Sequence, residues 1–255
     1  MNWKIKALKK ISKPKNLLLL EGLPGIGNIG KIAVDFIIDG LNAEKIYSFQ
    51  SYKMPHCVFI NEDNLIEVPS IEIYQKKIKG KTLFLITGDA QPLDEVSCYE
   101  FCNILLDLCK KNNCKEIITL GGIGTPEVPT KPKLYYTGNN KGIIEKYSGG
   151  SKYDGGVGPI IGVSGLLVGL AKQRKISGLT ILAETFRHPQ YLGVRGAKEV
   201  LKVLDKKLEL GLDFKKLDKE MKEIECKLNF TEKPIEKIEK VEEKKFDDGD
   251  ISYIG

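Results

Sequence analysis

Short apolar runs that end in glycine or proline, each followed by helical periodicity, constrain the fold of this chain more than any other feature. The run Leu17–Leu20 stops before Gly22 and Pro24, and such a run is typical of a central strand that is buried on both faces. Apolar residues then recur at three- and four-residue spacing from Asn28 to Ile38, which predicts a helix that Gly40 ends. The sequence therefore predicts a strand, a tight turn and a helix in succession.

The same alternation continues through most of the chain. The further expected strands are Lys45–Gln50, Cys57–Asn61, Leu65–Val68, Ile71–Tyr74, Thr82–Thr87, Cys114–Leu120 and Leu179–Ala183, and the further expected helices are Leu93–Asn112, Ser164–Lys175, Val194–Leu210 and Phe214–Leu228. Strand, helix and strand in succession predict right-handed parallel crossovers. Together they predict a three-layer α/β fold with a mixed, mostly parallel sheet.

Composition excludes several classes of protein. Of the 255 residues, 42% are apolar and 29% charged, and no apolar run approaches the roughly 18 residues that a membrane span needs. The net charge of +6 is uneven, because residues 1–16 carry six lysines and no acid while residues 231–255 carry five lysines and eight acids. The middle of the chain lacks the clustered basic and aromatic residues of a nucleic-acid binder. We expect a soluble, cytoplasmic protein that binds neither nucleic acid nor membrane.

The cysteines and histidines do not form a metal-binding pattern. Cys98, Cys102 and Cys109 fall at helical spacing, which favours reduced core residues. No C-x-x-C occurs, and the two histidines, His56 and His188, are far apart in the sequence. We expect no metal and no cofactor.

A G-x-G-x-x-G pattern lies between the first predicted strand and helix, in Gly25-Ile-Gly27-Asn28-Ile-Gly30. In a dinucleotide site this loop holds the pyrophosphate at the helix N-terminus, and an acid at the end of the next strand holds the ribose. Here the next predicted strand ends in Gln50 and Ser51. The alternative is a tight turn in which glycine permits positive φ and close packing.

Two more glycine clusters follow, Gly121-Gly122-Ile-Gly124 and Gly155-Gly156-Val-Gly158. We expect the first to end the strand before it and the second to precede a helix. Ligands bind at the carboxyl ends of strands in open α/β sheets. The candidate ligand crevice therefore comprises Gly25, Gly27, Asn28, Gly122 and Gly124.

No residue set for nucleophilic catalysis is complete. Ser164 lies in Gly162-Val-Ser-Gly165, but a nucleophile elbow also needs glycine at the position of Leu166, so Ser164 is favoured as a helix cap. His188 follows Glu184 and Arg187, which could pair with each other, yet no nucleophile can be assigned to it.

Carboxylates also follow a predicted strand, at Asp89, Asp94 and Glu95. Asp94 and Glu95 suit the first turn of the next helix, where they favour its macrodipole. We expect a protein without catalytic activity, and the alternative is an enzyme or binding protein for nucleoside-like or carboxylate compounds that uses the glycine crevice.

Four motifs in order make the chain resemble the archaeal branch of the proteasome assembly chaperone family. They are Glu21-Gly-Leu-Pro-Gly-Ile-Gly-Asn-Ile-Gly-Lys31, Thr87-Gly-Asp-Ala-Gln-Pro92, Leu120-Gly-Gly-Ile-Gly-Thr125 and Ala183-Glu-Thr185. The resemblance covers roughly residues 15–225. It implies a fold similar to nucleoside phosphorylases, a homo-oligomer for which a tetramer is a candidate, and binding to the proteasome core particle.

The last residues carry the expected partner contact. From Thr231 the sequence turns to Glu/Lys repeats, so we divide the chain into a domain at residues 1–230 and a charged tail at 231–255. The family resemblance implies a hydrophobic-Tyr-any-residue tip that enters pockets between proteasome α-subunits. The corresponding residues are Ile251, Tyr253, Ile254 and Gly255, with tyrosine third from the end rather than second.

Overall fold

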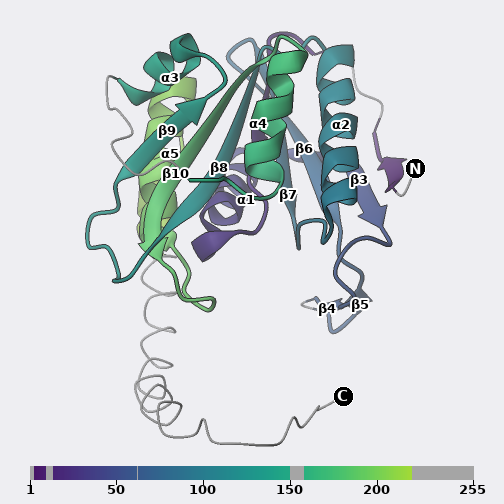
Figure 1. Ribbon diagram of the computed structural model, residues 1–255, viewed down its shortest axis with the longest axis horizontal. Helices are drawn as coiled ribbons and strands as arrows, with labels where there is room; N and C mark the ends of the chain where they lie inside the picture. Colours follow the sequence, from purple (N-terminus) through teal and green to yellow (C-terminus); the bar gives the residue numbers. More distant parts are fainter. Residues whose placement is uncertain (1–2, 10–13, 62, 150–157, 220–255) are drawn as a thin grey trace, which may run out of the picture. The chain divides into compact units, whose positions relative to one another are not determined.

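One eight-stranded mixed sheet forms the centre of the structure (Figure 1). The computed structural model describes residues 3–9, 14–61, 63–149 and 158–219. Across the sheet the strands follow the order β1 (Trp3–Ala7), β3 (Glu44–Ser51), β6 (Ile71–Ile78), β7 (Lys81–Gly88), β2 (Leu17–Glu21), β8 (Glu116–Thr125), β10 (Ser177–Phe186) and β9 (Leu134–Gly138).

Most of these strands run in one direction. Strands β7, β2, β8 and β10 are parallel neighbours. Strand β3 runs in this direction too. Strand β6 and the two edge strands, β1 and β9, run in the opposite direction and pair antiparallel with their neighbours. The predicted mixed, mostly parallel sheet is confirmed.

Helices cover both faces of the sheet and complete the predicted three layers. On one face α2 (Glu95–Lys111) packs beside α4 (Val163–Gln173), and on the other α1 (Ile29–Leu41) packs beside α5 (Val194–Leu208). In Figure 1, α2 and α4 lie in front of the sheet. The shorter α3 (Lys141–Ser148) packs against β9 and β10.

Strand β2 shows why an unbroken leucine run predicts a central strand. Leu17 and Leu19 share a core cluster with Phe101 of α2 and Leu167 of α4. Because successive side chains of a strand point to opposite faces, Leu18 and Leu20 face the other layer, and all four leucines of the run are at most 5% exposed. No position of the run is left for a polar residue.

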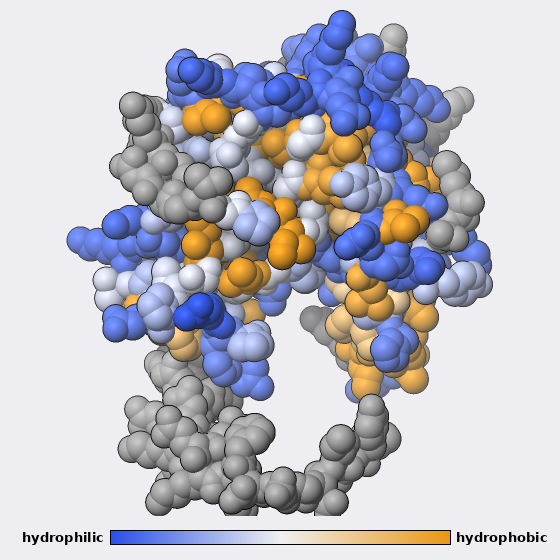
Figure 2. Space-filling view, in the orientation of Figure 1, coloured by the Kyte–Doolittle hydropathy of each residue, from blue (hydrophilic) through white to orange (hydrophobic). Residues whose placement is uncertain are grey.

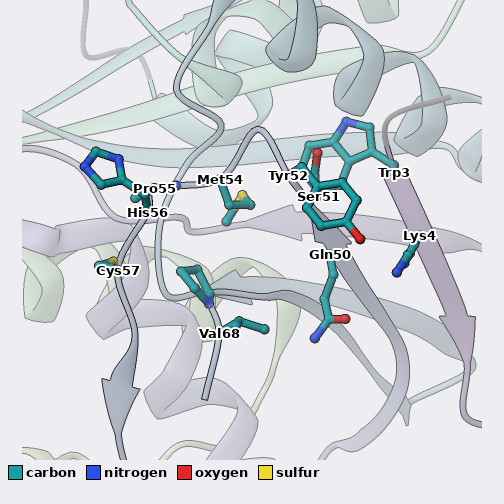
Figure 3. Close-up of a pocket in the computed structure, with 11 residues that line it drawn as sticks. Trp3, Lys4, Gln50, Ser51, Tyr52, Met54, Pro55, His56, Cys57 and Val68 are labelled. Carbon is teal, nitrogen blue, oxygen red and sulfur yellow. The ribbon is translucent and has the colours of Figure 1, made fainter. Parts of the chain in front are cut away.

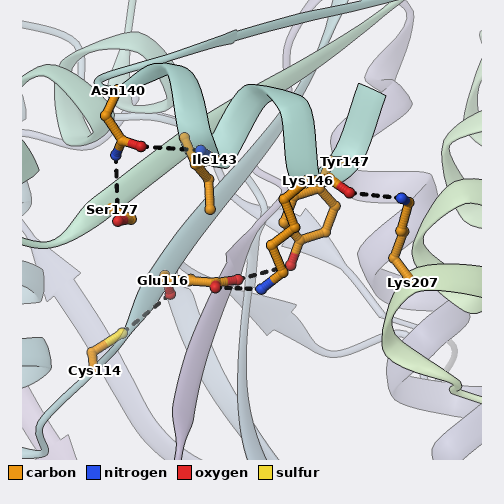
Figure 4. Close-up of polar contacts among 8 residues, drawn as sticks. All are labelled: Cys114, Glu116, Asn140, Ile143, Lys146, Tyr147, Ser177 and Lys207. Carbon is orange, nitrogen blue, oxygen red and sulfur yellow. Dashed lines mark hydrogen bonds and ion pairs between the residues drawn. The ribbon is translucent and has the colours of Figure 1, made fainter. Parts of the chain in front are cut away.

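Two strands and one α-helix of the described residues were not predicted, namely β1, β9 and α3. Asn140 caps α3, because its side chain accepts a backbone N–H of the first turn at 3.0 Å. Glu116 of β8 accepts the Tyr147 hydroxyl at 2.9 Å and pairs with Lys146 (Figure 4). Lys207 of α5 donates to the carbonyl of Lys146 at 2.6 Å. Polar contacts to β8 and α5 thus hold this short helix.

Some predicted boundaries were wrong. Strand β8 does not end at Leu120 but continues to Thr125, because its glycines pair in register with β10. The cap of α4 is Gly162, and Ser164 lies within the first turn. The two strands predicted between residues 57 and 68 are shorter than expected, since β4 (Phe59–Ile60) and β5 (Ile66–Glu67) form a separate two-stranded sheet.

The chain divides into two units, Met1–Asp213 and Phe214–Gly255. Of the second unit the structure describes only residues 214–219, which are helical, so most of the helix predicted for Phe214–Leu228 lies outside the described residues. The whole predicted tail, with Ile251, Tyr253, Ile254 and Gly255, lies outside them too. In the described part of the chain, no helix is long and apolar enough to cross a membrane.

Candidate functional site

A crevice of about 530 Å³ lies at the carboxyl ends of the parallel strands. It opens where β2 and β8 end near the first residues of α1 and α4, the position at which open α/β sheets bind ligands. Of the five predicted crevice residues, Gly25, Gly122 and Gly124 line it, whereas Gly27 and Asn28 do not. The rest of its wall is mostly apolar, including Leu23, Ile26, Ile29, Ile123, Ile160, Ile161 and Leu182.

The glycines of the first turn allow backbone segments to approach closely. A β-carbon on Gly22 would lie 2.1 Å from the carbonyl oxygen of Gly30, and one on Gly30 would lie 2.6 Å from that of Leu120. Gly27 has a φ of +65°, and a β-carbon there would lie 2.5 Å from the Thr185 hydroxyl oxygen. These contacts support the tight-turn interpretation of the G-x-G-x-x-G pattern.

Gln91 joins two walls of the crevice. Its side-chain amide donates to the carbonyl of Pro24 at 2.7 Å and accepts the backbone N–H of Val163 at 2.9 Å. The turn after β2 is thereby tied to the start of α4, which has no capping side chain at Gly162. The Gln91 amide therefore holds two walls of the crevice together, and both of its hydrogen bonds are to backbone groups of the protein.

A buried acid lies next to the crevice, at the end of β2. Glu21 is 0% exposed, and its Oε1 accepts the backbone N–H of Leu23 at 2.9 Å. In the described part of the chain, its Oε2 has no hydrogen-bond partner. Burial raises the pKa of Glu21 to about 7, although the Leu23 N–H and the nearby Ser164 hydroxyl act in the opposite direction.

Two buried threonines continue this polar row across the sheet. Glu21 pairs in register with Thr119 of β8, which pairs with Thr180 of β10. The Thr119 hydroxyl lies 2.9 Å from the carbonyl oxygen of Ser164 and 2.9 Å from the Thr180 hydroxyl. We did not single out Glu21 from the sequence, although one acid that ends a run of four leucines is a visible signal.

The last residues of β10 and the loop after it place their side chains in structural contacts. Both oxygens of Glu184 accept hydrogen bonds, from the backbone N–H of Lys133 at 3.0 Å and the Tyr135 hydroxyl at 2.6 Å. Among the described residues, Glu184 therefore holds the edge strand β9 instead of pairing with Arg187. The ring of His188 stacks on Phe186 at 5.9 Å between centroids.

The other acids considered as candidates also have local partners. Asp89 accepts the backbone N–H of Ser70 at 2.9 Å. Asp94 is the N-cap of α2, where it accepts the Ser97 N–H at 2.9 Å, and Glu95 is in the first turn as expected. The Ser97 bond is the first cause of a lowered pKa at Asp94, and Lys53 adds to it.

The predicted core cysteines are free thiols. Cys102 and Cys109 are buried, and Cys98 is half-buried. Among the described residues, no group of three or more histidines, cysteines or acids is placed to hold a metal ion.

An arm built on β4 and β5 exposes apolar side chains. Those exposed by 42% to 71% are Val58, Phe59, Ile60, Leu65, Ile66 and Val68. They appear as an orange cluster at the lower right of Figure 2, over the arm labelled β4 and β5 in Figure 1. A concentration of this kind on a two-stranded ribbon marks a surface suited to contact with other molecules.

Solved structures similar to this chain include two archaeal proteins of Pyrococcus furiosus. PbaB, described as an archaeal proteasome activator, is 31% identical with a TM-score of 0.80, over 91% of this chain and 99% of that one. PbaA, described as an archaeal homolog of proteasome-assembly chaperone, is 25% identical with a TM-score of 0.73, over 95% of this chain and 97% of that one.

Sequence comparison extends the likeness. An uncharacterized protein of Methanocaldococcus jannaschii is 28% identical over an alignment 260 positions long, which covers 97% of this chain and 96% of the relative. The model of the PAC2 family matches residues 19–230, which include the β2 to α1 turn, the crevice glycines and all five helices of the sheet layers. The chain therefore belongs to the PAC2 family.

Proposed function

We propose that this protein is a proteasome assembly chaperone or activator that binds the α-subunits of the core particle without catalysis. The observation that carries the proposal is the similarity to PbaB, because 31% identity covers nearly the whole of both chains. PbaA supports the same class of partner. The internal hydrogen bonds of Gln91 and Glu184 favour a structural role for residues that could otherwise serve chemistry.

We further propose that the contact is made by the tip Ile251, Tyr253, Ile254 and Gly255. Tyrosine offers a large apolar ring with a hydroxyl at its end, and the two isoleucines add apolar area. A homo-oligomer, for which a tetramer is a candidate, would present several tips at once and gain avidity. Its expected place of action is the cytoplasm, with the proteasome.

Binding to purified proteasome α-subunits and to the assembled core particle tests this function. The full-length protein is compared with residues 1–245, with Tyr253→Ala and with the neighbouring control Ser252→Ala. We expect truncation and Tyr253→Ala to weaken binding at least ten-fold, and Ser252→Ala to bind like the wild type. Equal binding by all four proteins would overturn the proposal that the tip makes the contact. If the full-length protein does not bind, the proposed partner is wrong.

The second candidate function is binding of a small molecule in the crevice. Its volume of about 530 Å³ lies within the range of known ligand pockets. A thermal-shift screen with nucleosides, nucleotides and carboxylates tests it. Gly25 has an extended backbone and open space around its Cβ position, so Gly25→Leu should abolish any shift without damaging the fold. A ligand shift that survives this substitution would place the ligand elsewhere.

A further inference from the structure

Strand β1 leaves one side of its backbone open. The N–H of Leu8 donates to the carbonyl of Ile46 in β3 at 2.9 Å. Since residues of an antiparallel strand alternate between hydrogen-bonding toward one neighbour and toward the other, Ile5 and Ala7 direct their N–H and C=O groups away from β3. In the part of the chain that is described, no strand pairs with that side, and β1 ends the sheet.

Two lysines of β1 add positive charge at this edge. Lys4 and Lys6 pair in register with Gln50 and Ser48, which are neutral. The Lys4 ammonium lies 5.3 Å from the centre of the Tyr52 ring. Within the described residues, neither lysine is in an ion pair, in contrast to Lys9, which pairs with Glu44 at 3.1 Å.

A pocket of about 460 Å³ with a mostly apolar lining adjoins the same strand. Its apolar lining comes from Trp3, Tyr52, Met54, Pro55, Val68 and Pro69 (Figure 3). Tyr52 is 91% exposed, so its ring is available to a bound molecule. The pocket has room for one aromatic or large aliphatic side chain, and it lies at the base of the apolar β4–β5 arm.

We propose that this edge binds an extended acidic segment of a partner protein, which adds a strand beside β1. Strand addition gives affinity through main-chain hydrogen bonds, and side-chain pockets give specificity. The backbone of the segment bonds to Ile5 and Ala7. One of its large apolar side chains enters the pocket, and its acids lie near Lys4 and Lys6.

The charge of β1 favours such a segment over a second copy of the same strand. Two β1 strands paired edge to edge would bring Lys4 and Lys6 close to the same lysines of the other copy. Like charges on neighbouring strands are destabilising, and lysines on edge strands discourage self-pairing. The same lysines attract the carboxylates of an acidic segment.

A labelled heptapeptide, Asp-Ile-Asp-Tyr-Asp-Ile-Asp, tests the proposal in fluorescence anisotropy titrations with the full-length protein. We expect saturable binding that weakens with added salt, and much weaker binding of the same peptide with lysine at each aspartate. Lys4→Gln/Lys6→Gln should weaken binding about five-fold, since exposed ion pairs each contribute little. The matched control is Lys131→Gln/Lys133→Gln, which removes two exposed charges at the same spacing before the opposite edge strand.

Three further measurements separate strand addition from simple charge attraction. Peptide binding should slow amide hydrogen exchange at Ile5 and Ala7, and a peptide with N-methylated isoleucines should lose binding. Val68→Ser, at a side chain that is 55% exposed, removes apolar lining without adding charge, and it should weaken binding through the pocket while leaving the circular dichroism spectrum unchanged. The proposal is overturned if the peptide fails to bind, if the two lysine pairs have equal effects, or if N-methylation has none.

Discussion

The carbonyl oxygen of Ile26 lies 2.2 Å from the position that a β-carbon on Gly122 would occupy. The turn between β2 and α1 therefore rests directly on the backbone of β8. Gly27, at φ +65°, makes the next close approach, to the side chain of Thr185 in β10. Position 122 therefore needs glycine because the backbone of the turn lies directly against it, and this contact shapes one wall of the crevice.

Gly122→Ala should destabilise the protein, because the added methyl group meets a backbone oxygen that cannot turn away. We expect a loss of about 2–3 kcal/mol in the free energy of unfolding, typical of overpacking, measured by urea denaturation. Gly25→Ala is the matched control, since nothing lies within 4 Å of its Cβ position. Equal stability of the two variants would contradict the packing role of Gly122.

Glu21 should make stability depend on pH. Its pKa is about 7 in the folded protein against an ordinary value of 4.5, so between these values the folded state binds a proton that the unfolded state has lost. Its contribution is therefore complete below pH 4.5 and declines as pH rises to about 7, by about 3 kcal/mol in total.

Glu21→Gln isolates this contribution, because glutamine keeps the acceptor for the Leu23 N–H without the charge. The variant should gain stability relative to the wild type as pH rises from 4.5 to 7, in denaturation series at several pH values. Glu127→Gln, at an exposed loop residue, is the control and should follow the wild type. A constant difference between Glu21→Gln and the wild type across this range would contradict the raised pKa.

The central strands and helices were predictable because their buried positions require apolar residues in recognisable patterns. The run Leu17–Leu20 is buried on both faces, which requires an unbroken series of apolar residues. Helices such as α5 bury one stripe of side chains, which requires apolar residues at three- and four-residue spacing. Strand β8 was cut short at Leu120 because glycine is a poor strand former. Its last residues become a strand only by pairing with β10, a long-range contact that no local pattern reveals.

The candidate site was predictable in part for the same reason. The glycine patterns around Gly25 and Gly122 placed the crevice at the correct end of the sheet, but Gly27 and Asn28 do not line it. The roles of Glu21 and Gln91 depend on α4, which lies more than 70 residues further along the chain than Gln91. The alternation Trp3-Lys4-Ile5-Lys6-Ala7 was a signal for the edge strand β1, which we did not predict.

Gln91→Ala should loosen the junction between the β2–α1 turn and α4. It removes the acceptor of the Val163 N–H and the donor to the Pro24 carbonyl, at an expected cost of about 1–2 kcal/mol. Amide exchange at Val163 should become faster. Gln190→Ala, an exposed residue of the loop after β10, is the control. Unchanged exchange at Val163 in Gln91→Ala would exclude the bridging role.

Tyr147→Phe should weaken the attachment of α3 to the sheet. The hydroxyl donates to Glu116 at 2.9 Å, and burial together with this carboxylate raises the pKa of Tyr147, so the protonated donor persists through the neutral range. Because Glu116 retains Lys146 as a partner, loss of the hydroxyl should lower the free energy of unfolding by only about 1 kcal/mol. Urea denaturation measures this change. Tyr99→Phe, at a ring that is 51% exposed on α2, should be neutral. If both variants match the wild type, packing of the Tyr147 ring rather than its hydroxyl holds α3 in place.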